Sequence, residues 1–335
     1  MSSKWIIQDH GSEGLSPMCD LRATFEQRTG GLTTLERLTG KMGCLPSGFT
    51  CEDAARAAMI TARTGLIHLT GGTATEVDQP CIEKPWDILD NLPKLLAGDL
   101  EEAPELQTPK SGSVVGDGRV DVDTTVTIFP GVVFDATAGS IRIEEGATIR
   151  PNAVICGPCW IGKGTTIIDG AQIKANTSIG PHCKVGGEVG STIIQGNTNK
   201  SHQGHLGDSV IGEWVNFGAG TSNSNLLNTY GDVIITDLEG NRHRTNRQFV
   251  GCFVGDHVKF AIETRIMTGT ICGTGAMIAS TQPPPTTTPR FTWHTDSGTK
   301  RFRIEKFLDI VKIVMARRGC ELEPATEVML RKLAK

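Results

Sequence analysis

Aliphatic residues recur at every sixth position along one stretch of this chain. The eight residues are Ile143, Ile149, Ile155, Ile161, Ile167, Ile173, Ile179 and Val185. A period of six fits neither an α-helix nor an ordinary exposed strand, because those elements bury a side chain about every 3.6 or every 2 residues. It fits a coil of short faces, three to a turn, in which each aliphatic residue points inward and stacks on its counterpart in the next coil. Glycine and proline between the faces suit the corners, as in Gly162-Lys-Gly and Gly180-Pro. The pattern predicts a parallel β-helix of the hexapeptide type.

The bulk composition is that of a water-soluble protein with an acidic balance. A length of 335 residues suggests roughly two domains of about 150 residues each. The formal net charge of −4 gives no electrostatic case for binding nucleic acid or an anionic membrane. We find no run near the roughly 18 apolar residues of a membrane helix and no signal-peptide pattern, so a cytoplasmic protein is expected. The ten cysteines are scattered, which favours reduced thiols over a disulfide framework.

Residues 1–112 differ in pattern from the rest and are expected to form a small α/β domain. The periodicity predicts a short strand starting at Lys4 and helices over 32–38, 54–64 and 86–96. The acidic, proline-containing stretch 98–109 is expected to be a linker.

The β-helix is expected to span residues 113–288, with two departures from the six-residue pattern. The first, residues 186–204, holds too many glycines and polar residues for regular coil faces. The second, residues 223–249, contains two short strand-like segments and predicts a hairpin that leaves the helix body.

The prolines of residues 282–289 are expected to end the β-helix, because proline cannot donate a ladder hydrogen bond. Residues 289–335 are then expected to form a helical tail. An apolar face over 302–317 predicts one helix, and Pro324 suits the first turn of a last one.

Polar residues gather around the first departure: Lys174, Lys184, Glu188, Asn197, Asn199, Lys200, His202, His205, Asp208, Asn216, Asn223 and Asn225. Histidine is the natural general base near neutral pH, and asparagine can orient a sugar or a carbonyl without adding charge. The same residues can also simply satisfy the turns of a β-helix. The residue types alone leave both interpretations open.

The sequence from Asn199 to Asn225 resembles the acetyltransferase half of GlmU, the bifunctional uridyltransferase and glucosamine-1-phosphate acetyltransferase. It resembles still more the GlmU-related bacterial sugar nucleotidyltransferases. The resemblance extends to residues 183–189, 289–293 and 17–38. It implies a left-handed parallel β-helix and a homotrimer with active sites between subunits.

The resemblance also implies roles for individual residues. His202 matches the histidine that acts as general base, and His205 matches a tyrosine that contacts the sugar phosphate. Asn216 matches the asparagine of the family's Val-Asn-Ile-Gly-Ala-Gly sequence, and Asn225 matches a later asparagine. Ala219 falls where a backbone amide faces the acyl-CoA. The implied reaction is attack of an amino sugar nitrogen on the thioester of acetyl-CoA, the co-substrate. His202 would remove the proton, and a backbone N–H near Gly218 to Gly220 would stabilise the oxyanion.

The chain departs from the GlmU pattern at several positions. His205 replaces the tyrosine, and Lys174, Lys184 and Lys200 stand in for the phosphate-binding residues by proximity only. The substrate is therefore expected to be a phosphorylated or nucleotide-linked amino sugar of unspecified identity.

The first domain lacks the glycine-rich phosphate loop of a sugar nucleotidyltransferase. Arg22 and Arg28 either grip a phosphate or form ordinary salt bridges. Three alternatives to acyl transfer therefore stay open. They are nucleotidyl transfer with Mg²⁺ through residues 1–112, a non-catalytic sugar-nucleotide-binding scaffold, and, as the weakest, a metal site at a trimer interface that joins His182 or His257 to His202 and His205. No metal ligand is assigned.

Overall fold

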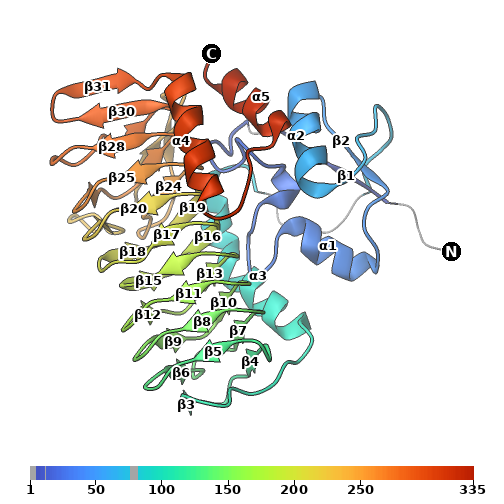
Figure 1. The fold of residues 1–335 in the computed structure, drawn as a ribbon, viewed down its shortest axis with the longest axis vertical. Helices are drawn as coiled ribbons and strands as arrows, with labels where there is room; N and C mark the ends of the chain where they lie inside the picture. Colours follow the sequence, from blue (N-terminus) through green and yellow to red (C-terminus); the bar gives the residue numbers. More distant parts are fainter. Residues whose placement is uncertain (1–4, 12, 76–81) are drawn as a thin grey trace.

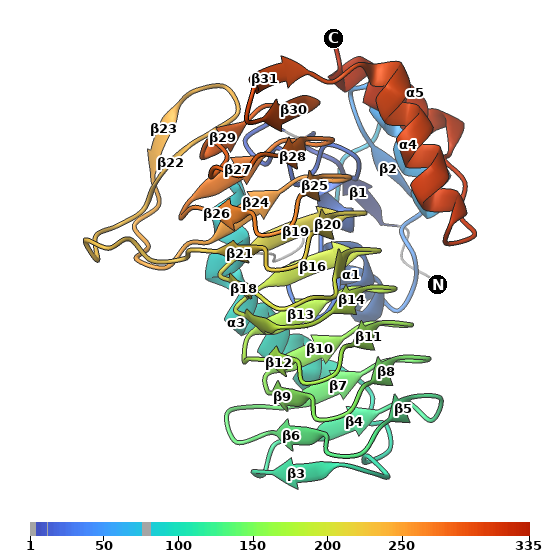
Figure 2. The same cartoon turned by 60° about the vertical axis from the view of Figure 1, so that its left-hand side comes forward.

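The computed structural model describes residues 5–11, 13–75 and 82–335. Its body is a column of coils with parallel strands on three faces, and helices lie along one side and at one end (Figures 1 and 2). Lys4, where a strand was expected to start, lies outside the described residues.

The first face is a sheet of nine strands. From the first coil to the last they are β4 Val120–Val122, β7 Ile141–Ile143, β10 Cys159–Ile161, β13 Thr177–Ile179, β16 Ile193–Gly196, β19 Val210–Glu213, β24 Cys252–Val254, β27 Thr270–Cys272 and β29 Thr287–Thr288.

The second face is a sheet of ten strands, the last of which is antiparallel to its neighbour. They are β5 Thr127–Ile128, β8 Thr148–Ile149, β11 Thr166–Ile167, β14 Lys184–Val185, β17 Asn199–Lys200, β20 Asn216–Phe217, β25 Lys259–Phe260, β28 Met277–Ala279, β30 Thr292–Thr295 and β31 Gly298–Arg301.

The third face consists of a six-stranded sheet followed by one further strand pair. The strands are β3 Ser113–Val115, β6 Val133–Asp135, β9 Val154–Cys156, β12 Gln172–Ile173, β15 Glu188–Gly190, β18 His205–Gly207, β21 Ser222–Asn223 and β26 Arg265–Ile266.

The aliphatic ladder fills the inside of this column. All eight residues from Ile143 to Val185 are 0 % exposed and belong to one core cluster, which also contains Phe217, Phe260 and Ile278. The prediction of a parallel β-helix is confirmed. Since each coil alone cannot bury its inner side chains, the stacking of neighbours supplies most of the fold's stability.

The prediction that the coil is interrupted over residues 186–204 is wrong. Strands β15, β16, β17 and β18 continue the three faces in register, with Val189 paired to Leu206 and Lys184 to Asn199. The corners are shorter, so the inward positions move from a spacing of six residues to spacings of four and five. The coil therefore persists while its sequence period is lost.

The excursion over 223–249 contains the predicted hairpin. Strands β22 (Ile234–Thr236) and β23 (Arg242–Arg244) pair antiparallel, and Ile235 packs on the outside of the first face. The prediction is confirmed.

The proline-rich segment does not end the β-helix. After it, β29 pairs in parallel with β27 and β30 pairs in parallel with β28. Prolines occupy the corner between faces, where no ladder donor is required, so one more coil follows. Helix α4 (Ile304–Ala316) and helix α5 (Pro324–Leu333) come after that coil, as the periodicity predicts.

The N-terminal part carries the parallel pair β1 (Ile6–Gln8) and β2 (Gly48–Thr50), a 3-10 turn η1 (Thr24–Glu26), and helices α1 (Thr34–Met42), α2 (Ala54–Thr64) and α3 (Pro85–Glu102). The expected linker is partly wrong, because α3 continues through residue 102. Its buried Asp99 accepts hydrogen bonds from Arg37 at 2.7 and 2.8 Å, which ties this end of α3 to α1.

The outer side of the first face is apolar and is covered. Helix α3 lies along it, and Trp86, Leu89 and Leu92 share a core cluster with Ile193 and Phe253 of the sheet (Figure 2).

The N-terminal part and the C-terminal helices share another core. Phe49 and Ile60 pack in one cluster with Phe307 and Leu330, and α5 lies against α2 (Figure 1). In the described part of the chain, no helix has the length and apolar character to cross a membrane.

Candidate functional site

Two stacked corners join the second face to the third. Residues 201–204 connect β17 to β18, and residues 218–221 connect β20 to β21 in the next coil. Asn199 is the register partner of Asn216, and a methyl group on Gly204 would lie 2.2 Å from the carbonyl oxygen of Thr221. The two corners are therefore in direct contact, and they carry the residues that the sequence singles out.

Lys200 lies inside the coil and not on its surface. It is the register partner of Val185, is 2 % exposed, and donates from its ammonium group to the carbonyl oxygens of Gly186 at 2.9 Å, His202 at 3.1 Å and Gly204 at 2.8 Å. Burial lowers the pKa of Lys200 to about 8. All three N–H donors are used, so Lys200 has none left for a substrate phosphate.

His202 stands at the tip of the corner that Lys200 holds. Its side chain is exposed, and among the described residues no hydrogen-bond partner meets the imidazole ring. The backbone is fixed while the ring is open, which is the arrangement that a general base for an external substrate requires.

The corner above His202 offers a backbone donor. At three other corners on this edge, the third residue donates its N–H to the carbonyl of the corner one coil back. These bonds join Asn152 to Pro130 at 3.2 Å, Gly170 to Pro151 at 2.9 Å and Glu263 to Ala219 at 2.6 Å.

Gly220 is the third residue of the corner at residues 218–221. The corner one coil back, residues 201–204, is irregular and does not offer a carbonyl to Gly220. Within the described chain the Gly220 N–H has no acceptor, while the N–H of Gly218 donates to Phe260 at 3.0 Å. The lost regularity thus leaves the Gly220 amide free at the corner next to His202, and the neighbouring Ala219 amide has no acceptor among the described residues either. The carbonyl of Ala219 accepts from Glu263, which leaves open the predicted role of the Ala219 amide toward the acyl-CoA.

Asn216 lies on the outer side of the second face, next to the corner. The amide nitrogen of Asn199 donates to its side-chain oxygen at 2.9 Å, and Ser201 donates in turn to the Asn199 side chain. Lys184 is exposed one coil below Asn199 in the same register column. The two asparagines and Lys184 thus line the second-face side of the site.

His205, Glu188 and Asn225 gather on the third face. The imidazole Nδ1 of His205 lies 3.7 Å from a carboxylate oxygen of Glu188. A methyl group on Gly207 would lie 2.6 Å from His205 Nε2 and 2.9 Å from Asn225 Nδ2, so both side chains lie over the bare Gly207 backbone. They therefore form a polar pair on one surface.

Asp208 orients Asn225. Its carboxylate accepts from Asn225 Nδ2 at 2.7 Å, and its pKa is raised because burial disfavours the charge. Lys174 is exposed on the same face, where a methyl group on Gly190 would lie 3.0 Å from its Cβ. Gly190 and Gly207 are register partners, so Lys174 belongs to the surface that carries His205.

Arg22 and Arg28 lie away from these corners and are buried. The Arg22 guanidinium donates to Asp256 at 2.6 Å and to the carbonyl of Met18 at 2.7 Å. Arg28 donates to the carbonyl of Gly31 and lies 3.8 Å from Glu36. Arg22 therefore forms a salt bridge, which was one of its two predicted roles, and this bridge joins the N-terminal part to the β-helix.

The histidines do not gather around a metal position. Across the described ranges, no group of three His, Cys, Asp or Glu side chains is placed to hold a metal ion. His257 is buried and stacks on Trp214 at 6.3 Å between ring centroids.

The resemblance implies a backbone donor near Gly218 to Gly220, and within the described residues only the Gly218 N–H of these three has an acceptor. The inward position of Lys200 was not predicted. A signal for Lys200 does exist, because it stands six residues after Ile194 and so falls on an inward position. The pairing of Glu188 with His205 had no signal, since it depends on register between coils.

No family model matches the chain. Several curated proteins do, over part of their length. A GlmU of Methanococcus maripaludis is 35% identical over 144 residues, 42% of this chain and 34% of its own length. A bifunctional sugar-1-phosphate nucleotidylyltransferase/acetyltransferase of Sulfurisphaera tokodaii is 36% identical over 142 residues, 42% of this chain and 35% of its own length.

A GlmU of Burkholderia vietnamiensis is 27% identical over 244 residues, 64% of this chain and 51% of its own length. Among solved structures, a candidate acetyltransferase of Bacillus cereus covers 67% of this chain and 99% of its own, at 12% identity and a TM-score of 0.23. The matches to curated proteins confirm the resemblance to GlmU-type bifunctional proteins. The chain spans about a third to a half of the length of these relatives.

Proposed function

From this relationship to GlmU-type proteins, we propose that the chain is an acetyltransferase that moves an acetyl group from acetyl-CoA to the amine of a phosphorylated or nucleotide-linked amino sugar. The observation that carries the proposal is the juxtaposition of an open imidazole, His202, with the unpartnered N–H of Gly220 in the adjoining corner. Acyl transfer needs a base for the attacking amine and a donor for the oxyanion, and these corners carry both.

The proposed reaction has three steps. The amine nitrogen attacks the thioester carbonyl carbon, and His202 accepts the proton that the nitrogen loses. The tetrahedral oxyanion receives the hydrogen bond of Gly220, which acts as a preformed donor. The carbon–sulfur bond then breaks, and the thiolate of coenzyme A leaves and takes up a proton as the amide forms.

The surrounding polar groups suit an amino sugar. His205, Asn225 and Lys174 lie on the third face and Asn216 and Lys184 on the second, so a sugar phosphate at the edge between them meets both sets. We include Lys174 and Lys184 as phosphate donors because both ammonium groups are exposed. Lys200 and Arg22 are left out because their donors are engaged inside the fold, and Arg28 is left out because its side chain is buried.

A homotrimer is part of the proposal. His202 lies on an open corner of one chain, and a second copy beside that edge would exclude water from the site. The first face is covered by α3, whereas the edge between the second and third faces carries the exposed His202 and can meet a neighbour. Since acetyl-CoA is a cytoplasmic metabolite, the cytoplasm is the proposed location.

Nucleotidyl transfer gains no support of its own from the site. The arginines on which it depended are engaged in internal contacts, and no metal cluster is found among the residues that the structure describes.

Release of free thiol from acetyl-CoA tests the function. The acceptors are glucosamine 1-phosphate, its galacto epimer and the corresponding nucleotide-linked amino sugars, and the matched control is N-acetylglucosamine 1-phosphate, which has no free amine. The proposal expects release with at least one free amine and none with the control. Absence of release with the whole panel, or release that does not require the amine, would overturn it.

A further inference from the structure

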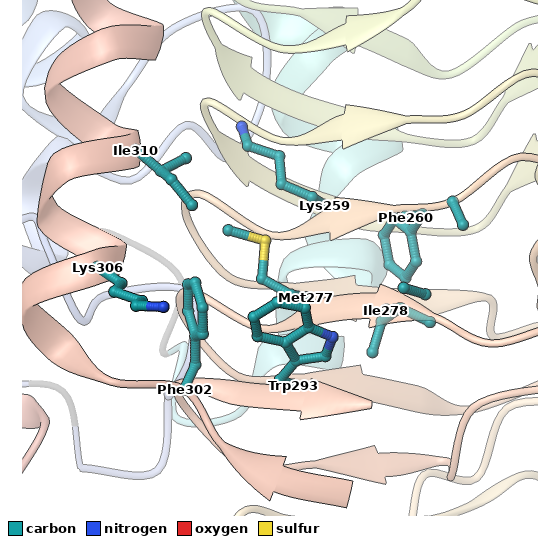
Figure 3. A pocket seen from close by; sticks show the side chains of 10 residues that line it. Lys259, Phe260, Met277, Ile278, Trp293, Phe302, Lys306 and Ile310 are labelled. Carbon is teal, nitrogen blue, oxygen red and sulfur yellow. The ribbon is translucent and has the colours of Figure 1, made fainter. Parts of the chain in front are cut away.

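A slot of about 480 Å³ lies between helix α4 and the outer side of the second face (Figure 3). Its floor is the register column of Lys259, Met277 and Trp293 on three successive strands. Its other wall is formed by Phe302, Lys306 and Ile310, two of which project from α4. A volume of this size is typical of small-molecule sites.

The slot is apolar apart from two ammonium groups. Its lining contains no carboxylate, and neither Lys259 nor Lys306 forms an ion pair within the described residues. The Lys259 ammonium donates to the carbonyl oxygen of Trp214 at one side of the slot. An uncompensated positive charge beside an apolar cavity is complementary to an organic anion.

The arrangement of the aromatic side chains limits the class of ligand further. Trp293 is 44% exposed although it lines a cavity, and the rings of Trp293 and Phe302 are nearly perpendicular, with centroids 5.1 Å apart and an interplanar angle of 80°. The indole therefore leaves one flat surface free, on which a planar ring can stack. Figure 3 shows Met277 beside the indole, and Lys306 extending from the helix toward Phe302, which lies between Lys306 and Trp293 in this view.

We propose that this slot binds a planar aromatic anion, whose ring lies on Trp293 and whose negative group meets Lys306. This is a second small-molecule site, separate from the His202 corner. Its failure and the failure of the acetyltransferase proposal are distinguishable, because the first is read from binding and the second from thiol release.

The probe is 1-anilinonaphthalene-8-sulfonate, added to the full-length protein and followed by its fluorescence. The expected result is saturable binding at one site per chain. Ile310→Glu places a negative charge in the slot and is expected to weaken binding by about tenfold or more. Ile313→Glu is the matched control, because Ile313 lies on the same helix, is 63% exposed and does not line the slot.

Competition defines the ligand class. 2-Naphthoate is expected to displace the probe, whereas its neutral amide and the chain-like decanoate are expected to be several-fold weaker. Lys306→Met is expected to lower the affinity for 2-naphthoate and to leave that for the amide unchanged. Circular dichroism melting verifies that the variants remain folded.

Three outcomes would overturn the proposal. One is equal probe binding by Ile310→Glu and Ile313→Glu. Another is displacement by decanoate or the neutral amide as strong as that by 2-naphthoate. The third is displacement of the probe by coenzyme A together with a raised KM for acetyl-CoA in Ile310→Glu, which would assign the slot to the acyl donor.

Discussion

The ammonium group of Lys200 donates to the backbone carbonyl of His202 at 3.1 Å, from inside the coil to the corner at its surface. Further bonds to Gly186 and Gly204 make Lys200 the internal anchor of the whole corner. Other coils place an aliphatic residue at this position, for example Val185. A charged residue has therefore replaced a core residue at the point where the backbone must hold an irregular shape.

Replacing Lys200 by methionine should separate stability from activity. Methionine fills the inward volume and removes the buried charge, which offsets part of the cost of the lost hydrogen bonds, so the melting temperature is expected to fall only moderately. The three carbonyls lose their donor, the corner loosens, and kcat is expected to fall by about tenfold or more because the base is misplaced. Steady-state kinetics measure this, with Lys163→Met, an exposed corner lysine, as control. An unchanged kcat would show that the corner holds its shape without the anchor.

The same lysine predicts a pH effect. Its pKa of about 8 is below the usual lysine value, so the group loses a proton, and with it one donor, as the pH rises through 8. The activity of the wild type relative to Lys200→Met is expected to be highest below pH 8 and to decline above it. The ratio cancels the titration of the substrate amine, which is common to both proteins. A ratio that stays constant from pH 7 to 9.5 would contradict the assignment.

The neighbouring Gly207 has space for no side chain. Gly207→Ala would bring a methyl group against His205 and Asn225, so both are expected to move and the KM for the amino sugar to rise by about tenfold. Gly98→Ala on α3 is the control, because a methyl group there meets nothing within 4 Å and favours the helix. Equal kinetics for the two variants would remove His205 and Asn225 from the substrate site.

His257 predicts acid sensitivity of the fold. Burial, together with the positive charge of Lys259, lowers the pKa of His257 to about 3. Between that value and the ordinary 6.5, the unfolded chain binds a proton that the folded chain does not, so stability falls as the pH drops through this window.

Asparagine at position 257 removes this titration and tolerates the positive φ of 62°. Between pH 6 and 4 the wild type is expected to lose about 1.4 kcal/mol per pH unit more than His257→Asn. Urea unfolding at each pH measures the difference. Parallel stability curves would show that His257 is protonated in the folded state.

The proposed assembly is tested by mass. Sedimentation equilibrium is expected to give three times the chain mass. Substitutions at the edge between the second and third faces are expected to lower this mass. Ile262, exposed by 70% next to the Gly220 corner, is the position to change. Ile262→Glu is expected to dissociate the trimer and to reduce kcat. A monomeric wild type with full activity would remove the trimer from the proposal.

The ladder from Ile143 to Val185 made the column predictable, because a six-residue period has few structural solutions. The path of residues 186–204 was not predictable in this way. Two short corners change the period, and a lysine takes an inward position, so the residue pattern loses the signal although the coil continues.

The candidate site divides along the same line. His202 and Asn216 follow from a motif in the chain, and the structure brings their corners together. The Gly220 amide and the Glu188–His205 pair depend on which backbone atoms meet across coils, which residue types do not encode. The proline-rich segment was misinterpreted for a related reason, since a corner needs no ladder donor and its prolines do not stop the next coil.

The most direct test of the central claim is thiol release from acetyl-CoA by His202→Ala beside the wild type, with the best amino sugar acceptor. Loss of the general base is expected to lower kcat by about 10²–10⁴-fold while the melting temperature is preserved, because the His202 side chain is exposed. An amine-dependent rate within a few fold of the wild type would contradict the account.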